Sequence, residues 1–190
     1  VAYDKLEGAL LKIVNKYQFE NFVMVIKSAG FITSGMINSK NALNFAYALY
    51  LRLRDDESLA EGERKRIVKR WFVLSMLTGR HSGSFESTWE QDIRRIGELG
   101  VAKYFQQVEE AELSDAFWAV SLPAALETTS TSSPFFQTFL AAQVNQNGRG
   151  FLSKAITVAA MHQQSGDIHH IVPKDYLQKN GFPDRGDYNQ

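Results

Sequence analysis

Histidine is scarce in this chain and gathers near one end. The sequence holds four histidines in 190 residues, and His162, His169 and His170 fall within nine residues of each other. The adjacent pair belongs to the stretch 167–174, which reads Asp-Ile-His-His-Ile-Val-Pro-Lys. A neutral imidazole can take a proton from water near neutral pH, and a second imidazole suits a divalent metal. The pair therefore predicts a site for metal-assisted hydrolysis of a phosphodiester bond.

Both imidazoles can serve one site only if the backbone bends near them. On a regular strand, His169 and His170 would point to opposite faces. Pro173 cannot donate a hydrogen bond to a sheet, so it is a reasonable end for such a strand. Asp167 would share a strand face with His169 and could orient its ring, or it could cap a turn. The residues alone leave both roles of Asp167 open.

The segment from His169 to Pro173 resembles the first element of the HNH (His-Asn-His), or ββα-metal, nuclease motif. The resemblance implies that His169 is a metal ligand and that His170 is the general base. It implies that Asn189 is the central asparagine, which helps to orient the base. The third element of the motif, a further ligand on a helix, would follow Gln190. We therefore expect this chain alone to bind metal poorly and to be inactive.

A wider resemblance covers nearly the whole chain. Segments 30–32, 42–47, 77–87, 167–177 and 188–190 occur in the order found in the C-terminal portion of the GmrSD-type family. These bacterial and archaeal phage-defence enzymes resemble modification-dependent (type IV) restriction endonucleases. The family combines an N-terminal ParB-like domain, a helical middle region and a C-terminal HNH nuclease. The resemblance implies DNA as the substrate, a divalent ion such as Mg²⁺, and a nucleotide effector bound by an N-terminal domain that this chain lacks.

The elements that must position the motif are predicted to be helical. Residues 1–126 carry apolar side chains at three- and four-residue spacing, as in Leu6, Leu10 and Ile13. Serines that could cap helices stand at Ser39, Ser58, Ser87, Ser114 and Ser133, and a short helix is predicted over 174–180. We predict a mainly α fold. A multi-helix domain over residues 1–150 is followed by an incomplete ββα-metal (HNH) element over residues 151–190.

Three positively charged features could contact DNA. Arg80 lies in the glycine- and hydroxyl-rich segment 78–87, which could hold a phosphate or simply connect two helices. Lys174 directly follows the motif and could contact the DNA backbone. The basic residues between Arg64 and Arg70 would share a helix, and they favour either a DNA-facing surface or a solvated face.

Composition limits the classes of function. The chain has 21 basic and 21 acidic residues, so its net charge gives no general support for nucleic-acid binding. It has no cysteine, which excludes disulfides, thiolate zinc sites and cysteine nucleophiles and fits a cytoplasmic location. No apolar run approaches the ~18 residues of a membrane span. The chain starts at Val1 and stops at Gln190 after a turn-rich stretch, so we expect a fragment of a longer protein.

The favoured prediction is a metal-dependent DNA endonuclease, with a homo-oligomer left open as a further partner. One alternative is a non-catalytic helical interaction or regulatory domain that carries a degenerate HNH remnant. Another is a structural zinc site built from His162, His169, His170 and Asp167, which would retain zinc without added metal.

Overall fold

The computed structural model describes residues 2–127, 130–150, 155–164 and 172–184. These residues are mainly helical, as predicted, and within them no strand is present. An isolated antiparallel bridge joins Arg149 to Thr157. Much of the predicted ββα element lies outside the described residues.

The structure contains α1 (Ala2–Ile13), α2 (Lys16–Lys27), α3 (Lys40–Arg54), α4 (Glu61–Thr78), α5 (Phe85–Leu99), α6 (Val101–Glu112), α7 (Leu122–Leu126), α8 (Pro134–Asn145), α9 (Val158–Gln163) and α10 (Lys174–Lys179). A 3₁₀ turn, η1 (Ser34–Met36), precedes α3, and a π-helical turn, η2 (Phe117–Ser121), precedes α7.

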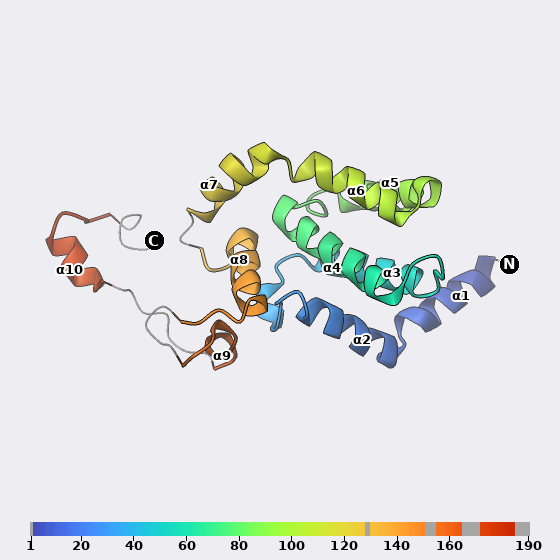
Figure 1. The fold of residues 1–190 in the computed structure, drawn as a ribbon, viewed down its shortest axis with the longest axis horizontal. Helices are drawn as coiled ribbons and strands as arrows, with labels where there is room; N and C mark the ends of the chain where they lie inside the picture. Colours follow the sequence, from blue (N-terminus) through green and yellow to red (C-terminus); the bar gives the residue numbers. More distant parts are fainter. Residues whose placement is uncertain (1, 128–129, 151–154, 165–171, 185–190) are drawn as a thin grey trace.

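Helices α3 and α4 pack together at the centre of the molecule (Figure 1). Helix α2 lies along one side of this pair, and α6, with α5 beside it, lies along the other. The interior is filled by aromatic rings, with Phe22 from α2, Phe45 from α3, and Trp71 and Phe72 from α4 almost fully buried. Burial of such large apolar side chains is the main force that holds the helices together.

Helix α8 crosses the end of α4 and contacts the turn after α2. Gly30 has a φ of 95° there, and an added Cβ would lie 1.9 Å from the carbonyl oxygen of Ala141. Only glycine combines this backbone conformation with so close an approach, so Gly30 fixes how α8 sits on the body.

The predicted helix starts are partly confirmed. Ser39 caps α3 by accepting a hydrogen bond from the Ala42 amide, and Ser133 caps α8. The predicted caps at Ser58 and Ser87 are wrong. Ser58 donates its hydroxyl and amide to Asp56, and α4 begins after Ala60. Helix α5 begins before Ser87, whose hydroxyl donates to the Ser84 carbonyl.

Pro123 neither ends nor breaks its helix. The proline stands in the first turn of α7, directly after the π-helical turn η2. Proline has no amide hydrogen and its ring crowds the preceding turn, and a widened turn is one way for a helix to pass such a residue. Phe139 on α8 is 45% exposed, although its spacing from Phe135 and Phe136 favours a buried position.

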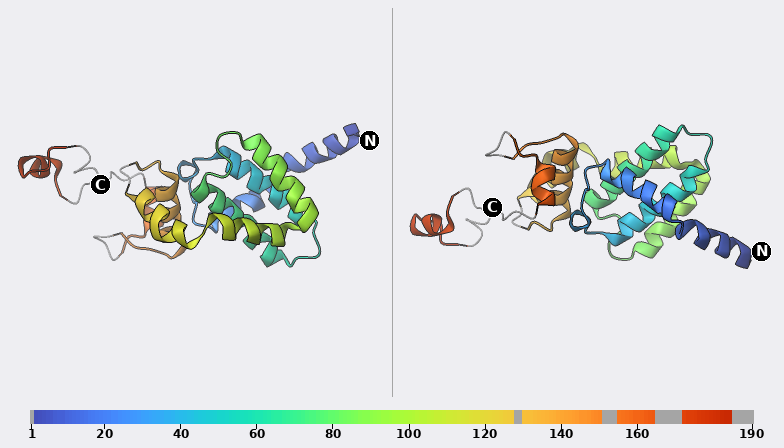
Figure 2. Two further views of the ribbon diagram at one scale, coloured as in Figure 1. Left: turned by 90° about the horizontal axis from the view of Figure 1, so that it is seen from above. Right: turned by 90° about the horizontal axis from the view of Figure 1, so that it is seen from below.

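Helices α1 and α10 extend away from this body at opposite ends of the molecule (Figures 1 and 2). Among the described helices, none combines the length and the apolar character needed to cross a bilayer.

Candidate functional site

The predicted nuclease residues are only partly covered by the structure. Asp167, His169, His170 and Asn189 all lie outside the described residues. Lys174 is exposed at the first position of α10, with Pro173 as the residue before the helix. Proline has its φ fixed near the helical value and lacks an amide hydrogen, so it commonly stands at a helix start. The motif is therefore followed at once by a helix.

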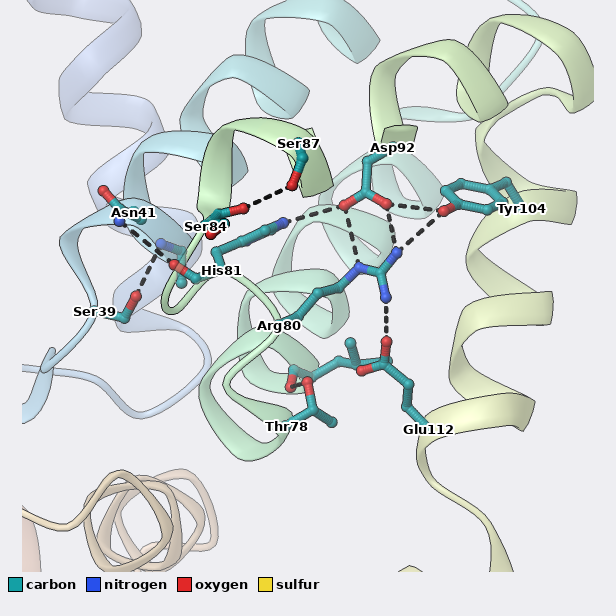
Figure 3. A network of polar contacts seen from close by, with 12 residues as sticks. Ser39, Asn41, Thr78, Arg80, His81, Ser84, Ser87, Asp92, Tyr104 and Glu112 are labelled. Carbon is teal, nitrogen blue, oxygen red and sulfur yellow. Dashed lines mark hydrogen bonds and ion pairs between the residues drawn. The ribbon is translucent and has the colours of Figure 1, made fainter. Parts of the chain in front are cut away.

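The described residues contain a different polar centre, built around Arg80 (Figure 3). Helix α4 ends at Gly79, which adopts a left-handed φ of 64° and turns the chain. The Arg80 side chain then reaches α5, where its Nε donates to Asp92 Oδ2 at 3.1 Å and its Nη2 donates to Asp92 Oδ1. It also reaches α6, where it donates to Tyr104 and to Glu112. The Arg80 side chain, which directly follows α4, therefore links α4 to both α5 and α6.

His81 lies beside Arg80 and is fully buried. Its Nε2 is 3.1 Å from Asp92 Oδ2, and its ring centroid is 4.5 Å from that of Phe45. Trp89 meets the ring edge to face. Among the described contacts the His81 Nδ1 has no hydrogen-bond partner. An imidazole that is 1% exposed cannot reach a substrate in this arrangement, so His81 acts within the fold.

Asp92 is the centre of the network. Burial alone would raise the pKa of this carboxyl, but hydrogen bonds from His81 and Arg80 and the charge of Arg80 lower it below its usual value. Tyr104 donates its hydroxyl to Asp92 Oδ1 at 2.8 Å. Burial, and then this hydrogen bond, raise the pKa of Tyr104 to about 12. Both shifts favour an ionised Asp92 among neutral or cationic donors.

The pKa of Arg80 is also raised. Burial alone would lower it, but hydrogen bonding and the nearby charge of Asp92, followed by the charge of Glu112, more than offset that effect. The side chain of Arg80 is 12% exposed. It borders an open pocket of about 570 Å³ that Glu112, Gln91 and Phe117 also line. A phosphate in that pocket would have to displace Glu112 from Arg80, so the contacts favour the helix-connecting role of segment 78–87.

The basic residues of α4 are mostly paired within the fold. Lys65 pairs with Glu61, Arg66 with Glu63, and Arg70 with Glu109 on α6, while Arg64 donates to the backbone carbonyls at the end of α3. Exposed pairs of this kind contribute little to stability, but they reduce the positive field of the helix. This favours the solvated-face interpretation of the cluster.

Sequence reasoning missed Asp92, Tyr104 and the role of His81. The sequence does contain one indication that Asp92 is buried. Asp92 follows Trp89 by three residues and precedes Ile96 by four, so it lies on the apolar face of α5. A carboxylate at such a position is buried only when it is paired, which predicts a cationic partner elsewhere in the chain.

No group of three histidine or carboxylate side chains that could hold a metal ion occurs within the part of the chain that the structure describes. A scan of protein-family models, a search of curated proteins and a search of solved structures each found no match to this chain.

Proposed function

We propose that this protein is a metal-dependent HNH endonuclease that cleaves DNA in phage defence. The observation that carries the proposal is the sequence of residues 167–174, with its histidine pair between an aspartate and a proline, together with Asn189. The resemblance of the chain to the C-terminal portion of the GmrSD-type family supports it. A mainly helical body agrees with the helical middle region that this resemblance implies.

The donor chemistry of the motif fits a divalent ion. Imidazole nitrogen binds such ions, and His169 supplies one such donor. Asp167 would accept a hydrogen bond from the His169 ring and so orient it. A bound ion would stabilise the negative charge that develops on the scissile phosphate. His170 would accept the proton of the attacking water at one ring nitrogen. Asn189 would hold the ring in orientation by accepting, at its side-chain amide oxygen, a hydrogen bond from the other ring nitrogen. The ammonium group of Lys174 would add positive charge beside the substrate.

The direct test is cleavage of plasmid DNA by the full-length protein with Mg²⁺ or Mn²⁺. His170→Ala should lower the rate by roughly 10²–10⁴-fold, the usual contribution of a general base. His169→Ala should weaken metal binding, so that activity is partly restored at high metal concentration.

His162→Ala provides the matched control. His162 is a partly buried residue of α9, close to the motif in sequence, and the nuclease mechanism gives it no role. This variant should cleave like the wild type. If the wild type and His170→Ala cut DNA at equal rates, the catalytic assignment is wrong.

The zinc alternative makes the opposite prediction for His162. A closed structural site would retain about one equivalent of Zn²⁺ through dialysis, and both His162→Ala and His169→Ala would release it. Elemental analysis of the purified protein therefore separates the two interpretations without an activity measurement.

The other alternative, a helical interaction domain, is favoured by one specific observation. Large apolar side chains of α1, including Leu6, Leu10 and Leu11, are at least half exposed. A protein with no cleavage activity and a bound partner on this surface would support that function in place of the nuclease.

A further inference from the structure

Helix α1 presents an apolar surface that no described part of the chain covers. Tyr3, Leu6, Leu10 and Ile13 of α1 recur at three- and four-residue spacing, which is the pattern that forms a seam between two helices. Tyr17, in the first turn of α2, continues the same spacing. Each of these side chains is at least half exposed. Leu11 of α1, at 65% exposure, and Val14, directly after the helix, at 71% exposure, widen this surface, which we call the α1 stripe.

Two contacts that the structure describes join the C-terminal end of α1 to the body of the protein. The Tyr47 hydroxyl of α3 donates to the Ile13 carbonyl at 3.0 Å, and Lys12 pairs with Asp55 at 3.0 Å. The rest of the helix projects away from the other helices in every view (Figures 1 and 2). A helix of 12 residues is marginal in water on its own, so α1 needs further contacts to remain helical.

The size of the α1 stripe matches one half of a protein interface. Its seven large side chains, half to three quarters exposed, present roughly 700 Å² of apolar surface, where a standard interface buries about 800 Å² on each partner. Contiguous apolar patches of this size on a soluble protein mark interaction sites.

The charges around the α1 stripe favour a second copy of this chain over a membrane. Residues 1–20 hold three acidic side chains (Asp4, Glu7 and Glu20) and three lysines (Lys5, Lys12 and Lys16). Helices that lie on anionic lipid carry an excess of lysine and arginine, which this segment lacks. A balanced set of charges does not repel an identical set, and the whole chain has a net charge of zero, which promotes association.

We propose that the α1 stripe is a homodimer interface, in which α1 of one chain packs against α1 of a second copy about a two-fold axis. The same surface serves both partners in such an arrangement, and the projecting position of α1 keeps the two helical bodies apart. This inference does not depend on the proposed nuclease activity.

Sedimentation equilibrium of the full chain tests the proposal. The wild type should be a dimer in the micromolar range, and the double variant Leu6→Glu/Leu10→Glu should be monomeric. Both side chains are exposed, so the double variant should keep the helical circular-dichroism spectrum and melting behaviour of the body. Lys5→Glu, a charge reversal on the opposite side of α1, is the control and should remain dimeric. A monomeric wild type, or a dimer that survives the double substitution, would overturn the proposal.

A second measurement covers the case in which the double variant fails to fold. The chain has no cysteine, so Lys5→Cys, on the side of α1 away from the stripe, provides a single site for a nitroxide label that leaves the interface intact. Dipolar coupling between labels on two chains supports the dimer, and its absence overturns it. Co-sedimentation of a monomeric wild type with vesicles of phosphatidylserine and phosphatidylcholine would assign the α1 stripe to a membrane surface and would also refute the proposal.

Discussion

Replacing Asp92 with alanine should be among the most destabilising changes in the chain. The side chain of Asp92 is 0% exposed and is the common acceptor for Arg80, His81 and Tyr104. Alanine would remove the negative charge from all three donors at once. The Arg80 guanidinium would stay largely buried, with Glu112 as its remaining charged partner.

The expected decrease in the free energy of unfolding follows from this geometry. Removal of one partner from a buried ion pair costs about 3–5 kcal/mol, because the other charge is left in a medium that solvates it poorly. Glu112 retains part of the pairing, which argues for the lower half of that range. Asp92→Asn keeps the shape and one acceptor oxygen but loses the charge, so it should cost about 2 kcal/mol, the scale of a hydrogen bond to a charged group.

Urea unfolding followed by tryptophan fluorescence would measure these values. Trp71 is 0% exposed and reports on the core. Asp55→Ala is the matched control, because Asp55 also pairs with two cations, Lys12 and Arg54, but its side chain is 49% exposed. Exposed pairs are worth no more than about 1 kcal/mol. If Asp92→Ala loses no more stability than Asp55→Ala, the network does not hold the helices together and the argument fails.

Three further predictions concern pH and backbone geometry. Because the folded pKa of Asp92 lies below its unfolded value, its contribution is present above about pH 4 and is lost on further acidification, so the stability difference between the wild type and Asp92→Asn should shrink in acid denaturation. For Tyr104 the sign is reversed. Its neutral form is favoured up to about pH 12, so the wild type should lose stability relative to Tyr104→Phe as pH rises from 10, measured by thermal melting. Gly30→Ala should lower the free energy of unfolding by about 2–4 kcal/mol, because of backbone strain and a clash with Ala141. Gly97→Ala, where nothing lies within 4 Å of the added Cβ, should raise it by about 0.5–1 kcal/mol. Thermal melting measures both changes.

The sequence predicts the class of the fold well, because helix formation depends on local patterns. Ser39 and Ser133 were identified as caps from their neighbours alone, and the structure agrees. Ser58 was misread because Asp56, two residues earlier, competes for its amide and hydroxyl. Short polar side chains often bond to the nearby backbone outside a helix, so a capping pattern does not fix the first residue of a helix.

The polar centre could not be located from local patterns. Arg80 meets Asp92 across 12 residues, Tyr104 across 24 and Glu112 across 32. Residues so far apart in the sequence come together only when α4, α5 and α6 pack. The apolar periodicity of one helix does not reveal which cation a buried carboxylate will contact. The segment 78–87 was recognised as special from its glycines and hydroxyls, but composition does not separate a phosphate-binding loop from a turn that presents an arginine to the interior.

A mutational screen that measured activity alone would confuse loss of stability with loss of catalysis. The Arg80 network and the histidine pair allow the two effects to be measured separately. The Arg80 network connects helices of the body, whereas the histidine pair precedes α10, which lies apart from that body in all three views. A variant of Asp92 should therefore lower the amount of folded protein, and any activity lost with it should return when rates are divided by the folded fraction. A variant of His170 should leave unfolding unchanged and lower the rate per folded molecule. Lower cleavage by an Arg80 variant would support a contact with DNA only if it remained after the same correction.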